Sequence, residues 1–299
     1  MSLTLATLAL AVGLELAWGE PPARAHPVAW FGRAIERVDR EWAHPRAVGL
    51  ASALVLPALA AGAVVGVVSL AAPLDPFLGV VAAGLALFVS TSLRMLLDVA
   101  RDVIAESERD LAEARESVRA LAGRSAAELS AGELRSAATE SAAENLADGL
   151  VAPLSAFALL SPFSLSLAAG GAAWVKAVNT LDSMLGYPEK SHGTASARLD
   201  DCVMWLPARA SAVLIALAGA NPGALLRARE WARAPPSPNS GWPMATLAAV
   251  LGVRLEKPGV YVLNPARELP TVSEARRGVR VVALAGALAY LLSGVFVWS

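Results

Sequence analysis

Three long apolar runs place much of this chain inside a membrane. They are residues 48–72, 77–97 and 281–298, and the only charged side chain in them is Arg94. A helix needs about 20 apolar residues to cross the hydrocarbon core of a bilayer, so each run has roughly the length of a span. A weaker run, residues 1–18, is interrupted by Glu15 and predicts a first span. We therefore expect an all-α, polytopic membrane protein with about four transmembrane helices, in a single domain over residues 1–299.

The composition of the chain agrees with this expectation and excludes several other classes. Of the 299 residues, 56% are apolar and 17% are charged, whereas soluble proteins carry about 25% charged residues. The 25 basic and 26 acidic residues give a formal net charge of −1, so no basic surface for nucleic acid is expected. The single cysteine excludes an intramolecular disulfide, and the three histidines stand in no common zinc-binding pattern.

The arginines orient the chain in the membrane. Segment 19–47 contains five of them, whereas the link between the second and third spans has no basic residue. Because basic residues accumulate on the cytoplasmic side, we expect a multi-pass protein of the cell membrane whose active site faces the cytoplasm. The segments expected to be cytoplasmic or membrane-proximal, and to carry the chemistry, are residues 19–47, 98–149, 176–202 and 221–278.

The segment after the third span has a seven-residue repeat. Its apolar positions are Leu97, Ile104, Leu111 and Val118. This spacing predicts one amphipathic helix over residues 98–122, with a coiled-coil seam, that extends from the membrane.

Residues 150–175 are apolar enough to span but are divided into short pieces. Pro153, Ser161-Pro162 and Gly170-Gly171 interrupt them. Because Pro and Gly end or weaken helices, we expect a re-entrant or membrane-surface hairpin here.

Three carboxylates are spaced along one predicted helix face in segment 136–148. Glu140, Glu144 and Asp148 stand at positions i, i+4 and i+8, and like charges at this spacing repel unless a cation or a substrate amine lies between them. The same segment carries Asn145. A solvated acidic face is the alternative interpretation.

Two later segments combine carboxylates with cations. Lys176, Asn179 and Asp182 lie within two helical turns, and the pair Asp200-Asp201 follows Arg198. Paired carboxylates suit Mg²⁺, which takes oxygen ligands and is usually shared with substrate phosphates. Paired aspartates also cap helices, so the spacing alone leaves both readings open.

A further polar segment, Asn239-Ser240-Gly241, precedes an apolar helical run. Free backbone N–H groups at a helix start bind phosphate or carboxylate, although a plain helix cap fits equally well. The chain has no P-loop, no Rossmann glycine motif and no G-x-S-x-G motif. The residues by themselves therefore predict a membrane enzyme that handles anions.

Taken together, five ordered segments resemble the signatures of the CobD/CbiB family, the adenosylcobinamide-phosphate synthases of cobalamin biosynthesis. They read AHPVAWFGRAIERVD (25–39), TESAAENLADGLVAPL (139–154), KAVNTLDSMLGY (176–187), ARLDDCVMWLPAR (197–209) and PNSGWPMATLAAVLGVRLEKPGVY (238–261). The resemblance covers most of the chain. It departs from the family at Gly19-Glu20-Pro21, where many members have G-D-P, but the charge is kept.

The resemblance implies an ATP-dependent amide ligation. A propionate of adenosylcobyric acid would be joined to (R)-1-aminopropan-2-ol or its O-phosphate, giving adenosylcobinamide or its phosphate. A carboxylate is a poor electrophile, so ATP is expected to convert it to an acyl phosphate with the help of Mg²⁺. The expected partners are these substrates, the lipid bilayer and other late cobalamin-pathway membrane enzymes, with no nucleic acid.

Roles for the motif residues follow as hypotheses. Mg²⁺ is assigned to Asp182, Asp200 and Asp201, and phosphates are assigned to Lys176, Arg198, Arg209 and Arg254. The ammonium group of the acceptor is assigned to Glu140 or Glu144, which would then accept its proton. Contacts to the carboxamides of the corrin are assigned to Asn145 and Asn179, and other substrate contacts to His26, Asp148, Asn239 and Ser240. The predicted catalytic residues are thus Glu140, Glu144, Lys176 and Asp182.

Two other classes of protein compete with the enzyme. One is a non-catalytic membrane protein of the same superfamily, such as an AmpE-like sensor or an assembly partner. The polar motif residues are all kept together, which favours the enzyme. The other is a corrinoid transporter, but transporters place polar groups near the middle of their spans, and the three clear spans have almost none.

Overall fold

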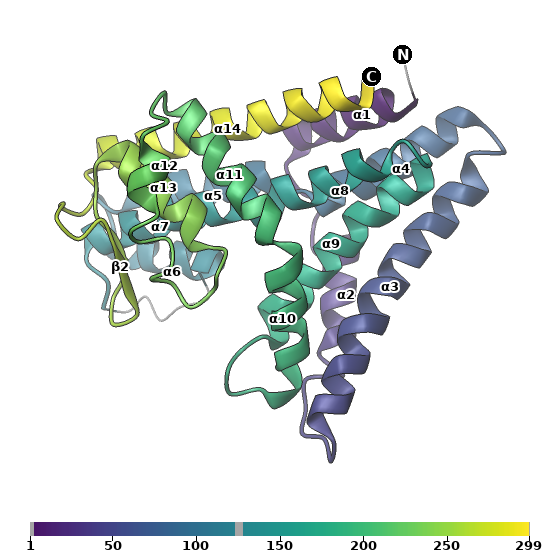
Figure 1. Ribbon diagram of the computed structural model, residues 1–299, viewed down its shortest axis with the longest axis horizontal. Helices are drawn as coiled ribbons and strands as arrows, with labels where there is room; N and C mark the ends of the chain where they lie inside the picture. The colour runs from purple at the N-terminus through teal and green to yellow at the C-terminus, as the bar shows by residue number, and fades with distance from the viewer. Residues whose placement is uncertain (1–2, 123–127, 299) are drawn as a thin grey trace. The chain divides into compact units, whose positions relative to one another are not determined.

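The structure, a computed structural model, describes residues 3–122 and 128–298 and is almost entirely helical (Figure 1). Its first half comprises α1 (Leu3–Trp18), α2 (Pro27–Ile35), α3 (Pro45–Ala71), α4 (Pro76–Ser90), α5 (Leu93–Glu106), α6 (Leu111–Ala122) and α7 (Ala131–Leu146). Next come η1 (Ala147–Val151), α8 (Ala152–Leu160), α9 (Leu165–Leu185), η2 (Ser191–Gly193), α10 (Thr194–Val203) and α11 (Trp205–Ala218). The last elements are α12 (Ala224–Ala228), α13 (Gly241–Leu251), β1 (Leu255–Lys257), β2 (Tyr261–Leu263) and α14 (Val272–Trp298). The expected all-α class is confirmed, with one small exception, the antiparallel hairpin of β1 and β2.

Four helical segments within the described residues are long and apolar enough to cross a membrane. They are Pro45–Ala71, Pro76–Glu106, Ala131–Leu160 and Val272–Trp298. Three of them contain the predicted spans at 48–72, 77–97 and 281–298 in whole or nearly so. The fourth, 131–160, joins a polar segment to an apolar one and was not predicted as a span. Helix α1 has 16 residues, a length of about 24 Å, which is shorter than a hydrocarbon core of about 30 Å.

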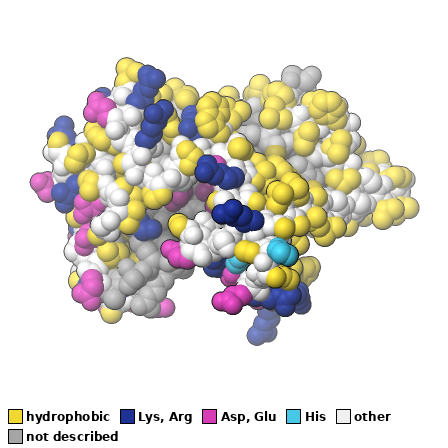
Figure 2. All heavy atoms as spheres, turned by 60° about the horizontal axis from the view of Figure 1, so that its bottom comes forward, with side chains coloured by type: hydrophobic (Ala, Val, Ile, Leu, Met, Phe, Trp, Pro, Cys, Tyr) yellow, Lys and Arg dark blue, Asp and Glu magenta, His cyan; other side chains and the backbone are white. Residues whose placement is uncertain are grey.

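The protein is therefore a polytopic membrane protein with about four spans, as expected. Helix α3 has the surface of a lipid-facing span, because Leu59 is 63% exposed and Leu70 is 75% exposed. Figure 2 shows that apolar side chains also gather on the right of the view, where no Lys, Arg, Asp or Glu side chains are seen. Large exposed apolar areas of this kind are unfavourable in water and favourable against lipid.

The seven-residue repeat after the third span does not form one long helix. Helices α5 and α6 are separate and pack against each other, with a turn between them. Asp110 caps the start of α6, because its Oδ1 accepts the backbone N–H groups of Ala112 (2.9 Å) and Glu113 (3.2 Å). The prediction of a continuous coiled-coil helix is wrong, although Ile104 and Val118 are both fully buried as their spacing implied.

The chain forms two compact units, which we describe separately. The first unit comprises residues 1–92, 148–204 and 290–299. Its central helix is α9, which packs against α3, α4 and α8. The close approach to α3 requires Gly170, because an added Cβ would lie 2.4 Å from a methyl group of Val65. Gly170-Gly171 therefore lies inside a continuous helix rather than dividing the apolar segment, whereas the predicted break at Ser161-Pro162 is present between α8 and α9.

Helices near the two ends of the chain meet within the first unit. Glu15 of α1 is 3% exposed, and its carboxylate accepts a hydrogen bond from the Tyr290 hydroxyl of α14. The charge that interrupts the weak N-terminal run thus has a specific polar partner.

The second unit comprises residues 93–147 and 205–289. Its core is the apolar helix α13, which packs against α7, α11 and α12. Gly252 ends α13 with φ +74°, a left-handed conformation that glycine adopts without strain. Helix α7 starts at a capping box, in which Ser130 and Glu133 bind each other's backbone N–H groups.

Candidate functional site

Lys176, on α9, is the centre of a polar cluster in the first unit. Its Nζ lies 3.5 Å from Ser92 Oγ. Burial lowers the pKa of the Lys176 ammonium, and the charges of Glu20 and Asp148 oppose this effect. His26 Nε2 lies 3.9 Å from Glu20 Oε2. Three residues predicted from three separate motifs, Lys176, Asp148 and His26, are thus brought into one neighbourhood.

Burial also shifts the two acid–base groups next to Lys176. Burial raises the pKa of the Glu20 carboxyl, although the nearby charge of Lys176 partly lowers it. Burial also lowers the pKa of His26. His26 Nδ1 accepts the N–H of Val28 at 3.2 Å and so caps α2. We conclude that His26 is a neutral capping residue at the edge of the cluster.

The Lys176 cluster lies where two helical segments are interrupted. The chain leaves helical geometry at Thr91 and Ser92, and the Ser92 N–H donates to the carbonyl of Gly149 at 2.9 Å. Gly149 belongs to η1, a π-helical turn, and such turns occur frequently at functional sites. The spacing predicted Glu140, Glu144 and Asp148 on one regular helix, whereas α7 ends at Leu146 and Asp148 lies in the π-helical turn.

A second cluster in the first unit pairs Asp182 with Asp201. Burial, and to a lesser extent the charge of Asp201 on α10, raise the pKa of Asp182 to about 6. Asp182 Oδ1 is buried and has no hydrogen-bond partner among the described residues. Gly186 is essential to this packing, because an added Cβ would lie 1.8 Å from that oxygen. A buried carboxylate oxygen without a partner is costly unless a cation binds it.

The predicted Mg²⁺ ligands can be tested against this geometry. Among the described residues, no group of three or more His, Cys, Asp or Glu side chains is arranged to hold a metal ion. The pair Asp182 and Asp201 nevertheless fits Mg²⁺, which is usually bound by one or two carboxylates together with substrate phosphates. Asp200 is partly buried and Arg198 is exposed, both on α10 with Asp201.

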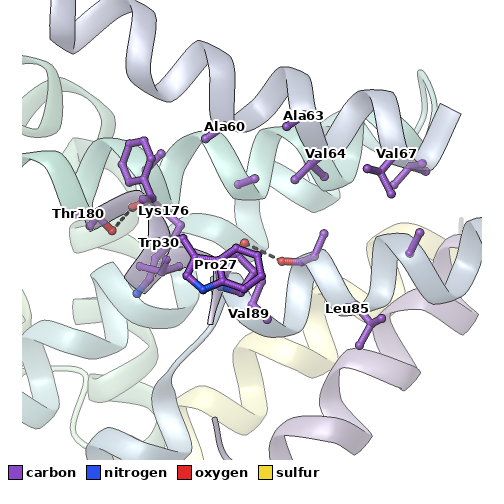
Figure 3. Close-up of a pocket in the computed structure, with 18 residues that line it drawn as sticks. Pro27, Trp30, Ala60, Ala63, Val64, Val67, Leu85, Val89, Lys176 and Thr180 are labelled. Atoms are coloured by element: carbon purple, nitrogen blue, oxygen red, sulfur yellow. Dashed lines mark hydrogen bonds between the residues drawn. The ribbon is translucent and has the colours of Figure 1, made fainter. Parts of the chain in front are cut away.

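An apolar groove of about 610 Å³ opens beside Lys176. Helices α2, α3, α4 and α9 line it (Figure 3). In Figure 3, Ala60, Ala63, Val64 and Val67 lie along α3. Lys176, Thr180 and Trp30 lie on the left of the view, and Val67 and Leu85 lie on the right.

In the second unit, Arg209 and Asn239, which come from two different motifs, are in contact. Arg209 Nη1 donates to Asn239 Oδ1, and Nη2 donates to the carbonyl of Pro238 at 3.1 Å. The guanidinium also lies 4.7 Å from the ring centre of Trp205 and 5.3 Å from that of Trp242. Arg209 therefore fastens the loop before α13 to α11.

Glu140, also in the second unit, is 1% exposed. Its Oε1 accepts from Ser136 Oγ at 2.7 Å and its Oε2 accepts from Tyr261 at 2.5 Å. Ser136 Oγ in turn accepts the N–H of Glu256 at 2.7 Å, so this network joins α7 to the β hairpin. Both carboxylate oxygens of Glu140 are thus engaged within the protein.

The other predicted residues of the second unit are more accessible. Glu144 and Asn145 are partly buried on α7, and Asn145 Nδ2 donates to the carbonyl of Ser141 at 2.9 Å. Arg254 Nε lies 3.2 Å from Glu256 Oε2. Ser240 does not cap α13 with its side chain.

On α9, in the first unit, Asn179 is partly buried. Sequence reasoning gave no role to Glu20, Ser92 or Tyr261. Glu20 carried a signal in its place in the Gly-Glu-Pro variant of a family motif, and Tyr261 carried one as the last residue of the fifth family segment, whereas Ser92 carried none.

These features define a class: an α-helical, multi-pass membrane protein with buried ionisable clusters at interrupted helices. The family described as CobD/Cbib protein has a model that matches residues 8–291. The chain belongs to this family.

Relatives similar over most of their length include three with related names. The Klebsiella pneumoniae subsp. pneumoniae "Cobalamin biosynthesis protein CobD" is 36% identical, over 93% of this chain and 90% of its own. The "Probable cobalamin biosynthesis protein CobD" of Pyrococcus abyssi is 39% identical, over 96% of this chain and 94% of its own. The protein of the same name from Methanothermobacter thermautotrophicus is 37% identical, over 86% of each chain. No solved structure matches the chain.

Proposed function

We propose that this protein is a cobalamin-biosynthesis enzyme of the cell membrane. It would join adenosylcobyric acid to (R)-1-aminopropan-2-ol or its O-phosphate, using ATP, at a site that faces the cytoplasm. Family membership and the names of the relatives support the pathway. The reaction itself rests on the family resemblance and on the chemistry of the clusters described above.

The observation that carries the proposal is the carboxylate pair of Asp182 and Asp201. The buried oxygen of Asp182 without a partner suits a bound cation. Asp182 and Asp201 would hold Mg²⁺, and the exposed Arg198 on α10 would contact a phosphate. When bound, Mg²⁺ would offset the charge of the phosphates during phosphoryl transfer.

The acceptor amine needs a carboxylate that can reach it. The amine is an ammonium at neutral pH, and it must lose a proton before its nitrogen attacks the acyl phosphate. Attack then forms the amide C–N bond and releases phosphate. Glu140 is a poor candidate for this proton acceptor, because both of its oxygens already accept hydrogen bonds within the protein.

The experiment is a ligation assay with detergent-purified full-length protein, adenosylcobyric acid, ATP, Mg²⁺ and each amine separately, read by mass spectrometry. We expect an amide product, at least a hundredfold less of it from Asp182→Asn or Asp201→Asn, and no change from Glu189→Gln. Glu189 is the matched control, an exposed carboxylate in the same unit. Unchanged turnover in either aspartate variant would remove that residue from the cation site. No product with either amine from folded wild-type protein would overturn the enzyme.

One observation favours a second function, the transport of corrinoids. Transporters bind their substrates at interrupted spans, and Ser92 and Gly149 are such interruptions in two candidate spans. Accumulation of labelled corrinoid in sealed vesicles without ATP, with no amide formed, would support transport in place of ligation.

A further inference from the structure

The groove beside Lys176 lies between two candidate spans. Helices α3 and α4 form its long walls, and its volume is about 610 Å³. Among the lining residues, Val67 is 59% exposed, Leu85 is 45% exposed and Trp30 is 50% exposed. In a bilayer the groove is therefore open to lipid along its side.

The groove offers a ligand almost no hydrogen bonds. Its lining hydroxyls are those of Ser90 and Thr180. Each donates to a carbonyl of its own helix at 2.7 Å, Ser90 to Ala86 and Thr180 to Lys176. An amide-rich corrinoid needs polar partners along its edge, so this groove suits a plain hydrocarbon chain instead.

Lys176 is the exception in this apolar wall. It is the one ionisable side chain among the described residues that line the groove. An ammonium group has three N–H donors, and within the described part of the chain its hydrogen bond goes to Ser92 Oγ at 3.5 Å. The remaining donors suit an anionic group at this end of the groove.

The carboxylates around Lys176 narrow the choice of ligand. Glu20 and Asp148 lie close enough for their charges to act on Lys176. A purely anionic head group would be repelled by them, whereas a zwitterion satisfies both signs: its phosphate meets Lys176 and its ammonium meets the carboxylates. Phosphoethanolamine is the common membrane head group with this pattern.

We propose that the groove binds phosphatidylethanolamine from the surrounding bilayer. One acyl chain fills the space between α3 and α4, and the phosphate contacts Lys176. This inference does not depend on the ligation reaction. It keeps the predicted role of Lys176 as a phosphate-binding residue but gives the phosphate a different source.

The test is native mass spectrometry of the full-length protein after exchange into a delipidating detergent. We expect the wild type to retain one phosphatidylethanolamine. Ala63→Phe, which fills the groove, should lose it. Leu59→Phe is the matched control, because Leu59 lies on the same helix, is 63% exposed and does not line the groove. Thermal unfolding of each variant shows that any loss of lipid is not loss of the fold.

A second variant tests the head group. In nanodiscs that contain phosphatidylethanolamine and phosphatidylglycerol in equal amounts, the wild type should retain the ethanolamine lipid about tenfold in excess, and Lys176→Gln should abolish this preference. Equal lipid retention by wild type and Ala63→Phe would overturn the proposal, as would a retained corrinoid. An unchanged preference in Lys176→Gln would remove Lys176 from the site.

Discussion

Tyr261 donates its phenolic hydrogen to Glu140 Oε2 across 2.5 Å, while Ser136 occupies the other oxygen of the same carboxylate. This relationship makes Glu140 a structural residue, which fixes the β hairpin on α7. We predict that Tyr261→Phe destabilises the protein by about 1.5–3 kcal/mol, the usual loss for a hydrogen bond to a charged group. Thermal unfolding checks this prediction. Tyr187→Phe is the control, because Tyr187 is 52% exposed, and equal stability of the two variants would contradict the assignment.

Two glycines on α3 should respond in opposite ways to alanine. At Gly49 an added Cβ would lie 2.0 Å from the carbonyl oxygen of His192, a backbone atom that cannot move aside. At Gly62 nothing lies within 4 Å. We expect Gly49→Ala to destabilise the protein by about 1–3 kcal/mol and Gly62→Ala to stabilise it by about 0.4–1 kcal/mol. Unfolding midpoints of the two variants, which share one helix, provide the comparison.

The contacts of Asp39 predict a loss of stability in acid. A hydrogen bond from Lys190 at 2.6 Å, with a further contact to His192, holds the pKa of Asp39 below its ordinary value of 3.8. The folded state therefore binds this proton less readily than the unfolded chain does. The contribution of this contact to the free energy of unfolding is present above pH 3.8, and it is lost as the pH falls through the lower pKa of the folded state. The pair is partly exposed, and we expect less than about 1 kcal/mol.

Asp39→Asn should remove this part of the acid dependence. Unfolding midpoints of wild type and variant, measured from neutral pH down to acid below the lowered pKa of Asp39, should differ near neutrality and converge at the acid end. Parallel curves over the whole range would show that the contact contributes nothing.

Arg209 should not be replaceable by lysine. Its planar guanidinium contacts Asn239 and Pro238 and stacks on Trp205 and Trp242, and an ammonium cannot reproduce both sets of contacts. We expect Arg209→Lys to cost about 1–2 kcal/mol and to speed hydrogen exchange in residues 237–241. Arg229→Lys, an exposed arginine of the same unit, should change neither, and slow exchange in both variants would contradict the role of Arg209.

The sequence predicted the helices well where burial in lipid decides the structure. Uncharged runs of about 20 residues have few alternatives in a bilayer, and the three clearest spans were found. It failed at α5 and α6, because the seven-residue spacing of Leu97, Ile104 and Val118 is compatible with either one long helix or two packed ones. The cap at Asp110 decides between them, and such local hydrogen bonds are easily overlooked in a periodic pattern.

The site was predictable only in part, for a physical reason. Lys176, Asp148 and His26 belong to recognisable motifs, so their types and spacing could be noted in advance. Their partners Glu20 and Ser92 come from the ends of other helices, and only the packing of α9 against those helices brings them together. The role of Tyr261 depends similarly on where the β hairpin meets α7.

The hydrogen bond between Glu15 and Tyr290 bears on how the protein is assembled during synthesis. The two residues are 275 positions apart. At about 5–20 residues per second, ribosomes produce Tyr290 on the order of 15–55 seconds after Glu15. During that interval the N-terminal helix carries a carboxyl group whose final partner does not yet exist, so it must be held by water, lipid head groups or the insertion machinery. Helix α1 therefore cannot complete its contacts in the folded protein until α14 has been synthesised.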